Sequence, residues 1–186
     1  EMLRSLVGSE MCIRDSLSLR LALGDVDYRV VPFDEIMPSI KSGEYDVGVI
    51  IHEGQLTWKD EGVNLVLDLG IWWNEETGLP LPLGGNVVRK DLGLEMCGKI
   101  TDDVRNSIEH SLSNPEEALK FAKEWGRGID DDTNEEFVGM YVNKRTLDYG
   151  DDGRDAIRLF LRKGQEIGMV RSNLDVDSIV FVGSGE

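Results

Sequence analysis

The sequence predicts an α/β fold in which mixed strands and helices come first and helices alone come last. Two apolar runs rich in β-branched residues, 26–33 and 47–51, bracket a short segment with helical character. From about residue 100 onward, apolar residues recur at the spacing of amphipathic helices. This order is typical of an α/β lobe followed by a helical return, and not of a closed doubly wound sheet.

The first regular elements are a helix end, a strand and a short helix. The Leu- and Ala-rich run 17–23 predicts the last turns of a helix, which Gly24 ends. Residues 26–33 predict a strand that stops near a proline. Asp34 is expected to cap a helix over 35–41.

The run 47–51 is continuously apolar, which favours a strand buried on both faces, as in a parallel sheet. With the preceding strand and helix it makes one βαβ unit. His52 follows at the carboxyl end of this strand. Residues 54–62 are expected to form a loop, and 63–69 another strand.

Residues 72–78 predict a turn or short helix, and residues 79–83 alternate Leu with Pro. Proline donates no ladder hydrogen bond, so we expect 79–83 to be extended without joining a central strand. Such a run suits a connection between two lobes. The domain division that we expect is an α/β lobe over 17–83, and a crossover with a helical return over 84–186.

The second half predicts four helices and a terminal extended segment. One apolar stripe comprises Ile100, Val104, Ile108 and Leu112, and a helix starts at Asn114-Pro115. A capping box begins at Thr133, and the last helix carries the apolar residues of 156–167. Residues 174–182 are expected to form a final strand or a tail.

Residues 1–16, EMLRSLVGSEMCIRDS, resemble translated adapter sequence, and we expect them to be a non-native stretch outside the fold. Cys12 therefore carries no chemical argument. The native sequence is expected to start near Leu17, within a domain.

Composition excludes several classes of function. The formal net charge of −16 argues against nucleic-acid and anionic-membrane partners. Neither Cys12 nor Cys97 has metal-ligand spacing, so no metal is expected, and a reducing cytoplasm is the default location. No window holds the ~18 apolar residues of a membrane span. A homo-oligomer stays open.

His52 is the candidate catalytic residue, because ligands of open α/β sheets bind beyond the carboxyl ends of strands. An imidazole with a pKa near ~6.5 is a usable base at neutral pH. A core histidine bonded to a backbone carbonyl is the alternative. His110, near the end of its helix, is expected to be structural or solvated. Gln55 and Thr57 are weaker candidates for substrate binding.

Two further groups are candidates for ligand contacts. Gly84, Gly85 and Asn86 offer backbone donors to an anion, although a plain turn is the simpler interpretation. Trp72 and Trp73 could stack on an aromatic ligand, although core packing is favoured. No catalytic triad, P-loop or dinucleotide-binding fingerprint is present.

Several motifs in order resemble the 1,4-dihydroxy-6-naphthoate synthase family. They are VPFDEI at 31–36, IHEGQLT at 51–57, the run from 68 to 86 with TGLPLPLGGN, FVGMYVN at 137–143 and TLDYG at 146–150. The resemblance extends from about Leu17 to Val170.

This resemblance implies a periplasmic-binding-protein-like fold of type II, in which two lobes close over a cleft. It implies a carbon–carbon lyase of menaquinone biosynthesis that acts on a small-molecule substrate. The family converts cyclic dehypoxanthinyl futalosine to 1,4-dihydroxy-6-naphthoate without metal or organic cofactor. His52 matches the family's proton acceptor.

The chain departs from the family at its start, and we expect that most of the first lobe is missing from these residues. A hydroxyl-bearing pair of the family falls near Arg14-Asp15, so its role is not carried over. We therefore expect little or no activity from these 186 residues alone. The alternatives are a solute-binding protein of the same fold, the sister enzyme chorismate dehydratase, and a purely structural helical module.

Overall fold

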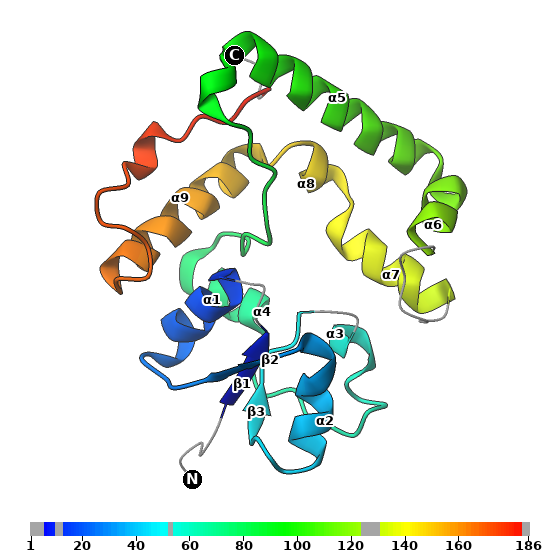
Figure 1. Cartoon of the computed structure of the whole chain (residues 1–186), viewed down its shortest axis with the longest axis vertical. Helices are drawn as coiled ribbons and strands as arrows, with labels where there is room; N and C mark the ends of the chain where they lie inside the picture. Colours follow the sequence, from blue (N-terminus) through cyan, green and yellow to red (C-terminus); the bar gives the residue numbers. More distant parts are fainter. Residues whose placement is uncertain (1–5, 10–12, 52–53, 124–130, 184–186) are drawn as a thin grey trace. The chain divides into compact units, whose positions relative to one another are not determined.

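The computed structural model describes residues 6–9, 13–51, 54–123 and 131–183 (Figure 1). The chain divides into two compact units. Unit 1 comprises Glu1–Leu83 and Leu159–Leu174, and unit 2 comprises Gly84–Arg158 and Asp175–Glu186. The architecture is mixed α/β, mostly helical with one small parallel sheet, so the coarse fold class is confirmed.

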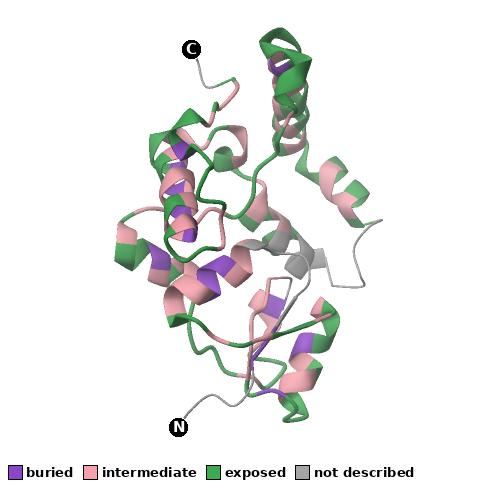
Figure 2. Ribbon diagram, turned by 60° about the vertical axis from the view of Figure 1, so that its left-hand side comes forward, coloured by how far each residue is buried: buried purple, intermediate pink, exposed green. Residues whose placement is uncertain are grey.

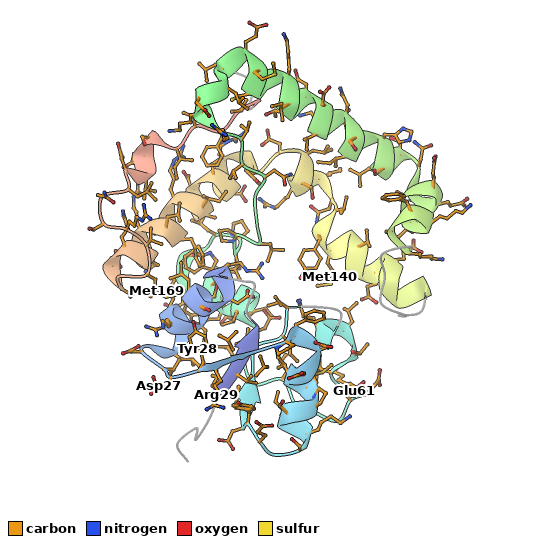
Figure 3. All side chains as sticks on the ribbon, in the orientation of Figure 1. Asp27, Tyr28, Arg29, Glu61, Met140 and Met169 are labelled. Carbon is orange, nitrogen blue, oxygen red and sulfur yellow. The ribbon has the colours of Figure 1, made fainter. Side chains whose placement is uncertain are left out.

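The sheet of unit 1 has three parallel strands in the order β2-β1-β3. They are β1 (Leu6–Ser9), β2 (Arg29–Val31) and β3 (Val47–Gly48). Val7 of the central strand is paired with Arg29 on one side and with Gly48 on the other. Asp27 and Tyr28 lead into β2 (Figure 3).

Our expectation that residues 1–16 stand outside the fold is wrong for the described part of that stretch. Leu6–Ser9 forms the central strand, and helix α1 (Ile13–Leu23) starts before Leu17. Val7 is completely buried and packs with Ile36 and Tyr45. Two consecutive apolar residues were too short a pattern to predict this strand.

The βαβ interpretation is confirmed, but its strands are shorter than expected and β1 lies between them. The connection contains a 3-10 turn, Phe33–Glu35, and helix α2 (Ile36–Lys41). Asp34 is not the cap of α2 as expected, because it lies inside the 3-10 turn and the N-cap residue of α2 is Glu35. Val47 and Gly48 are half-buried, so burial on both faces was also wrong.

A second cluster of unit 1 brings together three helices. Leu17 of α1, Trp73 of α4 (Leu69–Thr77) and Phe160 of α9 (Gly150–Glu166) are buried against one another. The α4 helix is capped by Asp68, whose carboxylate accepts from the N–H groups of Gly70 and Ile71. The short-helix expectation for this region is confirmed.

Two other expectations for unit 1 are wrong. Residues 63–68 form no strand, and Leu65, Val66 and Leu67 are exposed. Their loose alternation had no second strand to pair with in the described part of the chain. The expected loop 54–62 starts with a helical turn, α3 (Gly54–Thr57).

Unit 2 contains α5 (Leu94–Ser113), α6 (Pro115–Lys123), α7 (Asp131–Tyr141), α8 (Lys144–Leu147) and the first part of α9. The start of α6 and the apolar stripe on α5 agree with the sequence prediction. The predicted capping box at Thr133 is wrong, because the helix α7 already begins at Asp131. Residues 174–182 hold the 3-10 turn Val176–Ser178 and no strand.

No helix within the described ranges has both the length and the apolar character needed to cross a membrane.

Candidate functional site

The chain leaves the sheet at the end of β3, shortly before the catalytic candidate His52. The Val49 N–H donates to the Val7 carbonyl at 2.9 Å, so the chain keeps the sheet register just beyond Gly48. Ile50 packs against the first core cluster. His52 and Glu53 lie outside the described residues, and the role of His52 stays a prediction.

Close packing fixes the strand that leads to His52. A Cβ at Gly48 would lie 2.6 Å from Ile36 Cγ2, 2.8 Å from Ile40 Cδ1 and 3.1 Å from Val7 Cγ1. Only glycine lets α2 approach the strand this closely. The start of the histidine loop is therefore held by the core of unit 1.

Gln55 and Thr57 lie directly after the histidine loop, on α3, and both are half-buried. The helical turn is closed by the Trp58 N–H, which donates to the Gly54 carbonyl at 3.0 Å. These two polar side chains therefore share one short element next to the loop. Their contact with a substrate stays a prediction.

Gly85 and Asn86 belong to unit 2, where Asn86 is exposed. A Cβ at Gly85 would lie 2.9 Å from the Tyr149 hydroxyl. The Tyr149 ring is held by an edge-on contact with Phe181 at 6.1 Å and by the close approach of Gly153. The residue at position 85 is thus constrained by a tyrosine that our site prediction did not include.

One sequence feature could have pointed to Tyr149 as a site residue, namely its place in the TLDYG motif at 146–150. That motif carried no indication that the hydroxyl approaches Gly85, because the two residues are far apart along the chain. Gln55 and Thr57 are brought together in unit 1, and Gly85 and Tyr149 in unit 2.

Trp73 is a core residue, and the core-packing interpretation of this tryptophan is confirmed. Its ring is completely buried and meets Phe160 edge-on at 5.3 Å. The Trp73 Nε1–H donates to the Pro80 carbonyl at 3.1 Å, and Arg14 donates to the Leu83 carbonyl at 2.7 Å. These bonds anchor the Leu–Pro run 79–83 to α4 and α1.

His110 lies in the last turn of α5 and is exposed. Its Nδ1 is 3.3 Å from the Asn114 amide nitrogen. Its exposure agrees with the prediction that His110 is structural or solvated.

Ionisation in the described residues is perturbed mainly at two surface ion pairs of unit 2. Arg145 contacts both carboxylate oxygens of Asp152, at 3.0 and 2.7 Å, and its hydrogen bonds lower the pKa of that carboxyl. Arg89 likewise lowers the pKa of Asp91. Neither pair involves a predicted site residue. No group of three or more His, Cys, Asp or Glu residues suited to a metal ion occurs in the described ranges.

Comparison with known proteins identifies the family. The family described as "Menaquinone biosynthesis" matches residues 16–166. A 1,4-dihydroxy-6-naphthoate synthase of Streptomyces coelicolor is 36% identical over 82% of this chain and 54% of its own. The Thermus thermophilus enzyme of the same name is 41% identical over 70% of this chain and 48% of its own.

A crystal structure of an Archaeoglobus fulgidus protein shares the fold, with a TM-score of 0.83 and 34% identity. The match covers 91% of this chain and 66% of that one. The chain spans about half the length of the curated relatives that it matches. Because the family match covers most of its residues, the chain belongs to the menaquinone-biosynthesis family.

Proposed function

We propose that the protein to which this chain belongs is a carbon–carbon lyase that forms 1,4-dihydroxy-6-naphthoate from cyclic dehypoxanthinyl futalosine. The observation that carries the proposal is the family match over residues 16–166, together with two relatives that bear this enzyme name. The proposed architecture is the periplasmic-binding-protein-like fold of type II. In it, residues 17–83 belong to one lobe, and residues 84–186 cross to the other. The proposed location is the cytoplasm.

His52 is the proposed base. In its neutral form, the imidazole accepts a proton from a carbon of the sugar portion. The electron pair left on that carbon starts the fragmentation, in which the carbon–carbon bond breaks and the sugar-derived part leaves. Formation of the aromatic naphthalene ring supplies the driving force, so the step needs no metal or organic cofactor.

The proposed binding residues are Gln55 and Thr57 beside the histidine loop, and Gly85 and Asn86 in unit 2. The anchoring of β3 through Gly48 supports the assignment of His52 as the base, because a base must be held in place to act on one carbon atom. The half-buried side chains of α3 follow within a few residues of His52.

The test uses the full-length protein, with the chain joined to the additional length that its relatives carry. It is incubated with cyclic dehypoxanthinyl futalosine and with the chorismate dehydratase substrate. We expect naphthoate from the first, nothing from the second, and a loss of turnover of about 100-fold or more in His52→Ala. Equal activity of His52→Ala, dehydration of chorismate, or binding without turnover would each overturn the proposal.

A further inference from the structure

Tyr149 is held in place by its neighbours in unit 2, but the fold does not use its hydroxyl group. The Arg145 side chain donates to the Tyr149 backbone carbonyl at 3.1 Å, and the Tyr149 ring meets Phe181 edge-on at 6.1 Å. A Cβ at Gly153 would lie 3.0 Å from Tyr149 Cβ, so the start of α9 packs closely against this residue. Figure 2 shows that buried residues recur along α9, and Gly153 is the first of them. The position of the phenol ring is therefore defined by packing.

The hydroxyl end of Tyr149 approaches the backbone at Gly85. Its oxygen would lie 2.9 Å from a Cβ at Gly85, so the hydroxyl faces a segment that has no side chain at this point. Tyr149 is half-buried, and within the described ranges its hydroxyl makes no hydrogen bond. A tyrosine hydroxyl that is withdrawn from solvent usually has a hydrogen-bond partner. An unpartnered hydroxyl beside a bare backbone can donate to an oxygen atom of a ligand.

The carboxylates that flank Tyr149 in the sequence are paired with arginines. Asp152 is 2.7 Å from Arg145, and Asp148 is 2.9 Å from Arg154. These pairs balance negative charge locally, in a chain whose formal net charge is −16. An anionic ligand beside Tyr149 therefore meets less repulsion than the net charge alone indicates.

We propose that Tyr149 binds the carboxylate of the naphthoate product and of its precursor, with the phenol hydroxyl donating the hydrogen bond beside Gly85. The inference rests on the proposed function, because a naphthoate carries a carboxylate and cleavage on the sugar side leaves that group intact. Hydrogen bonds to a charged acceptor are stronger than those between neutral groups, which suits a phenol donor to this task. The predicted backbone donors of 84–86 belong to the same unit.

The role assigned to Tyr149 is substrate binding and not catalysis. The carboxylate lies on the aromatic ring, whereas the proton is removed from the sugar portion. The carboxylate has the same charge in the substrate, the transition state and the product, so a hydrogen bond to it stabilises all three equally. Loss of the hydroxyl should therefore raise KM and weaken product binding while kcat stays unchanged.

The test compares the full-length wild type with Tyr149→Phe, Gly85→Ala and the double variant. Titration calorimetry with 2-naphthoate, and with the uncharged 2-naphthamide of nearly the same shape, measures binding without turnover. Steady-state kinetics with cyclic dehypoxanthinyl futalosine gives kcat and KM. The control is Gly139→Ala in α7, where no atom lies within 4 Å of the Cβ position, and it should behave as the wild type.

We expect Tyr149→Phe to bind 2-naphthoate about tenfold more weakly and 2-naphthamide about threefold more weakly or less, because a neutral amide is the weaker acceptor. KM should rise about tenfold at unchanged kcat. Gly85→Ala should have the same selective effect, because its methyl group displaces the hydroxyl. The double variant should then bind no more weakly than either single variant, since both changes remove one interaction.

Two kinds of failure are separated by these measurements. Wild-type protein that binds 2-naphthoate but does not turn over the futalosine compound contradicts the proposed function, and a selective loss in Tyr149→Phe then still supports the carboxylate site. Equal losses for the two probes would mean that Tyr149 only stabilises the fold, and they overturn the inference. Unchanged binding of 2-naphthoate in Tyr149→Phe overturns it as well, and so does a wild type that binds 2-naphthoate no more tightly than 2-naphthamide.

Discussion

Unit 1 and unit 2 bury their apolar residues to very different degrees. Unit 1 contains two buried clusters, one around Val7, Ile36 and Tyr45 and one around Leu17, Trp73 and Phe160. In the described part of unit 2, buried apolar residues are few and scattered, namely Cys97, Ala156 and Val176.

Both units have ion pairs, and several of those of unit 2 gather near the start of α9. Arg145 pairs with Asp152, and Arg154 contacts Asp148 at 2.9 Å and Asp151 at 3.3 Å, all near the start of α9. Ion pairs at the protein surface add little to stability, whereas buried aromatic and aliphatic side chains add much. The comparison indicates that side-chain packing stabilises unit 1 more than it stabilises the described part of unit 2.

The largest effect is expected at the core of unit 1. Trp73→Ala should lower the free energy of unfolding by about 3–5 kcal/mol, because it leaves a cavity beside Leu17 and Phe160 and removes the bond to Pro80. Urea unfolding followed by far-UV circular dichroism measures this. Ile71→Ala, on the same helix but 60% exposed, is the control and should change stability by less than about 0.5 kcal/mol. Equal effects would mean that Trp73 is not a core residue.

A smaller loss is expected from Gly48→Ala. The added methyl would lie under 3.0 Å from side-chain atoms of Ile36 and Ile40, so α2 has to shift. Overpacking of this kind costs about 1–3 kcal/mol. The same urea titration measures it, and an unchanged midpoint would show that the first cluster of unit 1 is loose.

A glycine-to-alanine substitution in unit 2 should change stability in the opposite direction. Gly98 lies inside α5, and no atom lies within 4 Å of its Cβ position. Gly98→Ala should therefore stabilise the helix by about 0.5–1 kcal/mol. Helix content and melting temperature measure the gain. A loss of stability would mean that α5 is already tightly covered at this point.

The smallest effect is expected at the Arg145–Asp152 pair. Arg145 lowers the pKa of Asp152, so the folded state binds the proton less readily than the unfolded state. The pair therefore stabilises the fold above the ordinary aspartate range, near ~4, and the contribution is lost as the pH falls through the lowered pKa. Melting temperatures of the wild type and Asp152→Asn should differ slightly at neutral pH and converge in acid. A difference that grows in acid would contradict this sign.

The sequence predicted elements well where a pattern was long or a terminator was clear. The Gly24 stop, the Pro115 start and the four-residue stripe on α5 all correspond to local rules of helix geometry. The strand pattern at 63–69 failed because a strand needs a neighbour, and Leu65–Leu67 has none in the described ranges. The central strand β1 was missed because Leu6 and Val7 alone show no period.

The candidate site was predictable only in part, for a similar reason. A loop after an apolar run could be recognised along the chain, and this led to the prediction of His52, Gln55 and Thr57 as site residues. The approach of the Tyr149 hydroxyl to Gly85 depends on how α8 and α9 fold, and no local pattern encodes that contact.

Native-state hydrogen exchange tests the difference between the two units most directly. In the chain alone, amides of α4 around Trp73 should exchange only through unfolding of unit 1, and those of α5 should exchange much faster. Amides of α5 that are as protected as those of α4 in the chain alone would contradict the account.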